Sequence, residues 1–111
     1  MNEDIILVIG SNGQLGSVLT RELQKVHGYD NVIASDLYVD PCFSGIFEIL
    51  DATRIADIHS IVKQYSVTQI YHLAAILSSK GEEQPLNTWD LNIKMMLNVF
   101  EVARLSTINK V

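Results

Sequence analysis

Two patterns of apolar residues alternate along the chain. Short runs of β-branched residues and leucine occupy residues 5–9, 31–35, 46–50 and 69–73, and such runs are typical of strands buried on both faces of a parallel sheet. Between them, apolar residues recur at helical spacing over residues 14–26, 53–65 and 85–105. Residues 110 and 111 read as the start of a fifth strand. The alternation predicts an α/β fold with a doubly wound parallel sheet and right-handed crossovers.

The expected helices differ in how they distribute their apolar residues. The first carries an apolar stripe at Leu15, Val18, Leu19, Leu23 and Val26. The long third helix, Pro85 to Leu105, has apolar residues on more than one face, so one face should cover the sheet and another should be buried elsewhere. We expect that second contact to be a homodimer interface. The alternative is that further residues of the same polypeptide cover it.

Composition limits the class of protein. With 111 residues, the chain is expected to form one domain, residues 1–111. The net charge is −5 and the basic residues are scattered, which disfavours nucleic acid as a partner. No apolar stretch approaches the roughly 20 residues of a membrane span, and the acidic start is unlike a signal peptide. A single cysteine, Cys42, cannot form an internal disulfide, and the histidines show no metal-ligand spacing. We therefore expect a cytoplasmic protein without a metal site.

A glycine-rich turn directly follows the first strand and opens the first helix. Gly10 is expected to permit the tight turn, Gly13 a close approach of a pyrophosphate, and Gly16 close packing of helix on sheet. The helix N-terminus would then offer free N–H groups to the phosphates. This arrangement predicts the phosphate-binding loop of a Rossmann fold, with candidate cofactor contacts at Gly10, Asn12, Gly13, Gln14, Leu15 and Gly16.

Asp36 ends the second strand, 20 residues after Gly16. A carboxylate at this place accepts hydrogen bonds from adenosine ribose hydroxyls and repels a 2′-phosphate. Neither the glycine loop nor the neighbourhood of Asp36 and Leu37 contains Lys or Arg, so NAD is favoured over NADP. The alternative is an aspartate that merely stabilises a turn or caps a helix.

Further candidates follow the later strands. Asp51 and Ala52 lie where an adenine would rest, although Asp51 is also placed to cap the next helix. His72 is expected to be a satisfied core histidine, and a chemical role is the alternative. Leu73, Ala74 and Ala75 are cofactor candidates, and the two small alanines would let a cofactor pass close to the backbone. The hydroxyls of Ser78 and Ser79 would face either substrate or water. Asn92 would bind cofactor, hold the backbone of the next strand or face water.

Together these motifs resemble the N-terminal part of an extended short-chain dehydrogenase/reductase, along essentially the whole chain. Residues 31–36, 74–79 and 89–92 are most similar to the short-chain type of L-threonine 3-dehydrogenase. Nucleotide-sugar epimerases share the first motifs but fit the later region less well. The resemblance implies NAD binding, a substrate pocket near Ser79, oxidation of L-threonine to 2-amino-3-ketobutyrate, and a dimer built partly on the long helix.

The family's general base is a tyrosine followed four residues later by a lysine, and this pair is missing. Such a base must take the hydroxyl proton as hydride leaves the substrate carbon. Here the four tyrosines are followed at that offset by Ile33, Cys42, Gln69 and Ala75. We expect the segment to stop before the catalytic and substrate-binding part and to be inactive by itself. A dinucleotide-sensing module without catalysis remains the other interpretation.

Overall fold

The computed structural model describes residues 4–74, 85–106, 108, 110 and 111. Its elements are β1 (Ile6–Ile9), α1 (Gln14–His27), a 3-10 turn (Tyr29–Asn31), β2 (Val32–Asp36), β3 (Ile46–Ile49), α2 (Ile55–Tyr65), β4 (Gln69–His72) and α4 (Pro85–Leu105). The four strands form one parallel sheet in the order β3-β2-β1-β4. The predicted α/β doubly wound sheet is confirmed.

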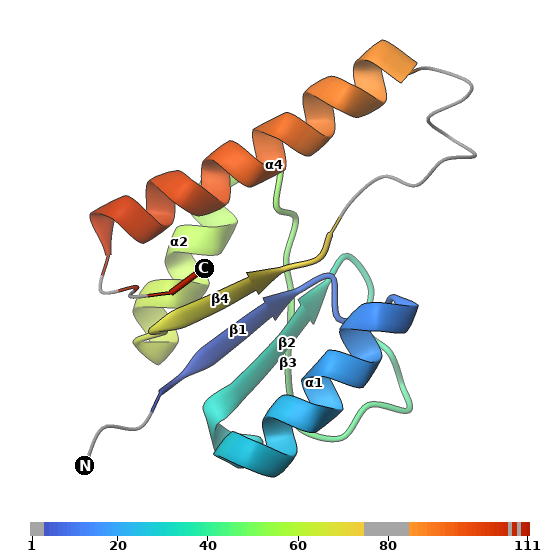
Figure 1. Ribbon diagram of the computed structural model, residues 1–111, viewed down its shortest axis with the longest axis vertical. Helices are drawn as coiled ribbons and strands as arrows, with labels where there is room; N and C mark the ends of the chain where they lie inside the picture. Colours follow the sequence, from blue (N-terminus) through green and yellow to red (C-terminus); the bar gives the residue numbers. More distant parts are fainter. Residues whose placement is uncertain (1–3, 75–84, 107, 109) are drawn as a thin grey trace.

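The sheet lies between two helical layers. Helix α1 covers one face, and α2 and α4 cover the other (Figure 1). Lys110 forms an isolated parallel bridge with Gln69, next to β4. This bridge lies at the outer edge of β4 and agrees with the strand-like character expected of residues 110 and 111.

Alternate residues of β1 enter two separate cores. Ile6 and Val8 pack beneath α1 with Leu23 and Val32. Leu7 and Ile9 face the larger core, which α2 and α4 close over the other side of the sheet. All four residues of β1 are at most 1% exposed. Burial on both faces is the reason that this strand reads as a continuous apolar run rather than an alternating one.

Only part of the apolar stripe expected on α1 packs on the sheet: Leu23 is buried and Leu19 packs against the core beside it. Leu15, Val18 and Val26 are 69%, 52% and 77% exposed, whereas Gly16, Thr20, Leu23 and Gln24 are buried. Because Gly16 brings the helix very close to the sheet, small or hydrogen-bonded side chains occupy this contact. Thr20 Oγ1 donates to Gly16 O at 2.6 Å, and Gln24 Nε2 donates to Ser44 O at 3.0 Å. These bonds remove the cost of burying polar groups.

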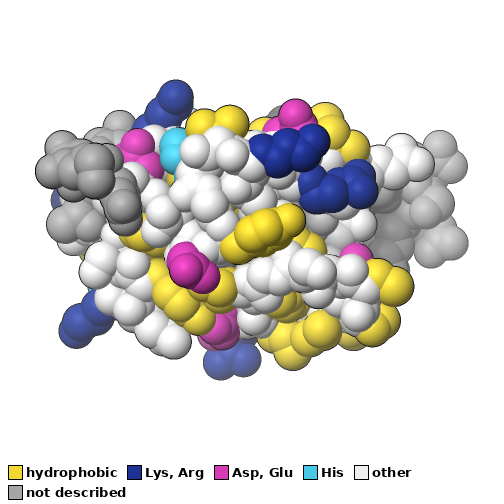
Figure 2. Space-filling view, turned by 90° about the horizontal axis from the view of Figure 1, so that it is seen from below, with side chains coloured by type: hydrophobic (Ala, Val, Ile, Leu, Met, Phe, Trp, Pro, Cys, Tyr) yellow, Lys and Arg dark blue, Asp and Glu magenta, His cyan; other side chains and the backbone are white. Residues whose placement is uncertain are grey.

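Helix α4 packs as its pattern predicts, with Met95, Val99 and Val102 buried against the sheet and α2. On its outer side, Leu97 and Phe100 remain 57% and 51% exposed. The surface seen from below in Figure 2 also carries hydrophobic side chains in separate patches among charged ones. No helix in the described ranges has both the length and the hydropathy to cross a membrane.

We predict that Gly16→Ala destabilises the fold and that Gly13→Ala does not. A Cβ at Gly16 would overlap Gly10 O and lie 3.0 Å from Ser11 Cα, so α1 would have to shift. The expected loss in the free energy of unfolding is about 1–3 kcal/mol, as for other overpacked contacts. At Gly13 the nearest atom would be Gly10 O, at 3.7 Å, which is ordinary contact. Urea unfolding of both variants measures this difference, and equal stability would contradict the packing argument.

Candidate functional site

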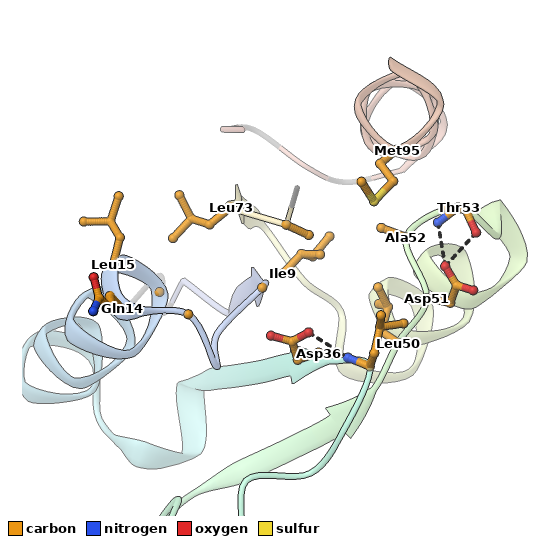
Figure 3. A pocket seen from close by; sticks show the side chains of 15 residues that line it. Ile9, Gln14, Leu15, Asp36, Leu50, Asp51, Ala52, Thr53, Leu73 and Met95 are labelled. Carbon is orange, nitrogen blue, oxygen red and sulfur yellow. Dashed lines mark hydrogen bonds between the residues drawn. The ribbon is translucent and has the colours of Figure 1, made fainter. Parts of the chain in front are cut away.

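A cleft of about 490 Å³ opens at the carboxyl ends of the strands (Figure 3). Residues from the glycine turn, from the ends of all four strands and from α4 line it. They are Ile9, Gly10, Gly13, Gln14, Leu15, Gly16, Asp36, Leu37, Leu50, Asp51, Ala52, Thr53, Leu73, Ala74 and Met95. Most of the predicted site residues are thus brought to one place, although they come from four segments of the chain. Parallel strands cause this, because their carboxyl ends share one edge of the sheet.

The glycine turn is fixed by backbone contacts with β2 and β4. Gly10 has φ +90°, and a Cβ there would lie 2.6 Å from Ala74 N. The N–H groups of Gly10 and Ser11 both donate to Ser35 O, at 2.9 and 3.0 Å. The expectations of a tight turn at Gly10 and close packing at Gly16 are confirmed, since neither position has room for a side chain.

The N-terminus of α1 faces the cleft with its first-turn amides available. Gly13 is the N-cap and supplies no side-chain hydrogen bond, and the first turn has no acidic residue. The first helical bond runs from Ser17 N to Gly13 O at 2.8 Å, so the amides of residues 14–16 precede it. Such amides, together with the helix dipole, favour an anion. Space beside Gly13 leaves the approach open.

Asp36 is held in a defined orientation at the end of β2. Its Oδ2 accepts from Asn12 N at 3.0 Å, and its Oδ1 accepts from Leu37 N at 2.8 Å. A carboxylate has about four lone-pair sites. Asp36 therefore stabilises the turn and keeps acceptor capacity towards the cleft. The two expectations for this residue, a ribose acceptor and a turn-stabilising aspartate, are thus compatible. Among the described residues that line the cleft, none is Lys or Arg.

Asp51 stabilises a turn rather than a helix end. Its Oδ1 accepts from Thr53 N at 3.0 Å and from Thr53 Oγ1 at 2.6 Å (Figure 3). Helix α2 begins later, at Ile55, with Arg54 as its N-cap. The interpretation of Asp51 as the N-cap is therefore wrong: its short bonds to Thr53 form a separate turn before the helix.

Apolar side chains make the rest of the lining. Leu15 and Leu73 lie towards one end of the cleft, while Ala52 and Met95 lie towards the other (Figure 3). Ala52 is almost fully buried, and its carbonyl accepts from Asn98 Nδ2 at 3.0 Å. An apolar cleft with a few fixed polar groups is typical of a small-molecule site.

Asn98 is a residue that the sequence reasoning missed. It attaches α4 to the turn after β3, on the same side of the helix as the buried Met95, Val99 and Val102. An amide on an otherwise apolar helix face is the signal that would have identified it, since buried polar groups need partners.

The remaining predicted residues lie elsewhere. Asn12 and Asn92 are not among the residues lining the cleft, although both make polar or electrostatic interactions. Ala75, Ser78 and Ser79 lie outside the described residues. Within the described part of the chain, no cluster of His, Cys, Asp or Glu is suited to a metal ion.

His72, at the end of β4, is partly buried, and its Nδ1 has no hydrogen-bond partner within the described part of the chain. Burial lowers the pKa of this imidazole below its ordinary value of 6.5, because removal from water disfavours the charged form. The side chain is accordingly neutral at pH 7. The expectation of a satisfied core histidine is met only in part, because the ring is partly buried and its Nδ1 has no partner among the described residues.

The chain is similar to proteins of a known family. The NAD-dependent epimerase/dehydratase family matches residues 6–111. The chain belongs to this family. A family relative, an uncharacterised epimerase/dehydratase of Staphylococcus haemolyticus, is 36% identical over 103 residues, which are 89% of this chain and 32% of that protein.

Solved structures of L-threonine dehydrogenases are also similar. The enzyme from Clostridium difficile is 40% identical with a TM-score of 0.89, covering 99% of this chain and 36% of that one. A GalE-like L-threonine dehydrogenase from Cupriavidus necator, in its holo form, is 40% identical with a TM-score of 0.86, over 91% of this chain and 33% of that one. The chain thus spans about a third of the length of its relatives.

The histidine at the end of β4 generates a prediction about pH. Since the pKa of His72 is lowered in the folded state, the unfolded state binds a proton first on acidification. The stability that neutral His72 contributes is present above pH 6.5 and is lost as the pH falls below that value. The urea midpoint should drop between pH 7.5 and pH 5.5, and this drop should be smaller in His72→Gln than in the wild type. His59→Gln, at an exposed position of α2, is the control and should keep the wild-type difference. An unchanged pH dependence in His72→Gln would contradict the assignment.

Proposed function

We propose that this chain binds NAD and forms the cofactor-binding part of an NAD-dependent L-threonine dehydrogenase. One observation carries the proposal: an anion-binding helix N-terminus, an oriented carboxylate and an apolar slot line the same cleft. These features match the three chemistries of the adenosine half of a dinucleotide, which are phosphate, ribose and adenine.

Each part of the cleft then has a role. The amides that begin α1 hold the pyrophosphate, which approaches closely over Gly13. Asp36 accepts from the ribose hydroxyls and repels a 2′-phosphate. Ala52 and Met95 flank the adenine, and Asp51 lies beside them to accept from its amino group. The small residue Ala74 lets the cofactor pass over the end of β4.

The bound cofactor would accept a hydride from the substrate, and the protein would position both molecules. We extend the proposal to Ala75 and Asn92 as further cofactor contacts and to Ser78 and Ser79 as substrate contacts. The small-molecule substrate would be L-threonine, oxidised to 2-amino-3-ketobutyrate. Similarity to two L-threonine dehydrogenases at 40% identity supports this choice.

We also propose that the protein forms a homodimer through α4. The exposed Leu97 and Phe100 support this, because apolar side chains gathered on the outer side of a helix are typical of an interface. A wild-type protein that sediments as a monomer at micromolar concentration would contradict it.

The cofactor assignment predicts a change of selectivity in Asp36→Ala. The loss of hydrogen bonds from a charged acceptor should weaken NAD binding about tenfold. NADP binding should weaken less or improve, since the repulsion of the 2′-phosphate is also lost. Asp30→Ala removes the same charge from an exposed position outside the cleft and is the matched control. Calorimetric titration with both nucleotides measures the two affinities. Equal selectivity in wild type and Asp36→Ala would count against the ribose role.

The substrate assignment predicts that the whole protein reduces NAD with L-threonine and does not act on UDP-sugars. Absorbance at the wavelength of the reduced nicotinamide follows the first reaction, and chromatography of the sugar nucleotides follows the second. Turnover of UDP-sugars without oxidation of L-threonine would favour an epimerase or dehydratase, the other activities of this family. Binding of NAD without turnover of either substrate would favour a sensing module.

A further inference from the structure

Asn12 joins two segments that border the cleft. Its backbone N–H donates to Asp36 Oδ2 at 3.0 Å, and its side-chain Nδ2 donates to Tyr38 O at 2.6 Å. A single residue of the glycine turn thus contacts the chain both at the end of β2 and two residues beyond it. Asn12 also lines a second depression, together with Ser17 and Arg21 of α1.

The segment that Asn12 holds has few other attachments. Tyr38 and Val39 are 77% and 56% exposed, so little apolar burial fixes their position. The next tie between this segment and α1 comes at Ser44, whose carbonyl accepts from Gln24 Nε2. Segments with few buried contacts open locally at low cost in free energy. The bond from Asn12 to Tyr38 is therefore a major restraint on the residues that follow Asp36.

This restraint acts on the carboxylate. With Tyr38 O held, Leu37 is fixed between two bonded residues, and its N–H stays directed at Asp36 Oδ1. Both oxygens of Asp36 are then set by amides, and the remaining lone pairs keep one direction. A preorganised acceptor binds its ligand more tightly than one that must be ordered on binding.

We propose that Asn12 is a positioning residue, which sets the preference of the cleft for an unphosphorylated adenosine ribose by holding Asp36 and the segment after it. The inference rests on the proposed NAD binding. When the restraint is lost, Asp36 holds the ribose hydroxyls less well and turns away more readily from a 2′-phosphate. Affinity for NAD falls and affinity for NADP falls less or rises, so their ratio decreases.

The test is Asn12→Ala, with NAD and NADP affinities measured by calorimetry. The variant keeps the N–H bond to Asp36 and loses the bond to Tyr38. The ratio of affinities should decrease roughly two- to tenfold, the range for one hydrogen bond. Asn31→Ala is the matched control, because it removes a bond of the same kind, from Asn31 Nδ2 to His27 O at 2.8 Å, at the far end of α1. That control should keep the wild-type ratio.

A double variant separates positioning from a general structural role. In the Asp36→Ala background, Asn12→Ala should leave the ratio unchanged, because the carboxylate through which it acts is absent. If Asn12→Ala fails to fold, as judged by circular dichroism, Asn12→Ser replaces it, since serine is too short to reach the same carbonyl.

Three outcomes would overturn the inference. They are an unchanged ratio in the Asn12 variant, an equal loss of both affinities, and the same change of ratio with and without Asp36. If one of these outcomes is found and the wild-type protein still binds NAD, the role of Asn12 is wrong but the proposed function is not contradicted. A wild-type protein with no affinity for NAD would overturn both.

Discussion

The close contact of Gly16 with the carbonyl of Gly10 is the constraint on which the rest of the cleft depends. It sets the distance between α1 and the sheet, and thereby the place of the amides at the start of the helix. The turn itself is attached to β2 through Ser35 O, while Leu73 N donates to Ile9 O on the other side at 2.8 Å. Backbone atoms make most of this arrangement, and bonds that involve side chains, from Ser11 Oγ to Ser35 O and from Asn12 N to Asp36 Oδ2, add to it. Its geometry is consequently less adjustable than that of a site built from flexible side chains.

The cleft places opposite electrostatic preferences next to each other. The start of α1 favours negative charge, whereas Asp36 at the neighbouring strand end disfavours it. A ligand must therefore present an anionic group to one and neutral donors to the other. The net charge of −5 gives no general attraction for anions, so the local field of oriented amides has to supply it.

The sequence was most informative where a residue's role depends on its immediate neighbours. The strands could be predicted because burial on both faces demands apolar runs, and the residues of the cleft because parallel strands end at one edge. The three glycines were identified by their position between a strand and a helix. In each case the pattern lies within a few consecutive residues.

What could not be predicted involves bonds between distant segments. Thr20 and Gln24 are buried on α1, whereas Leu15 is exposed, because their side chains donate to carbonyl groups. Thr20 bonds to Gly16 O in the same helix, and Gln24 bonds to Ser44 O in the loop before β3. The contacts of Asn98 with Ala52 and of Asn12 with Tyr38 join residues that only the folded sheet brings together. A single sequence holds no signal for such pairs beyond the presence of a polar side chain where a partner is required.

The strand order has a consequence for how the chain acquires its structure. Ile6 in β1 pairs with Val32 on one side and with Gln69 on the other. During synthesis the first neighbour emerges early, but the second follows only after β3 and α2 have been made. Until then β1 presents an apolar edge with unpaired amides, a form prone to association with other chains. Pairing with β4 closes this edge, so the protection of β1 depends on residues that are made late in the chain.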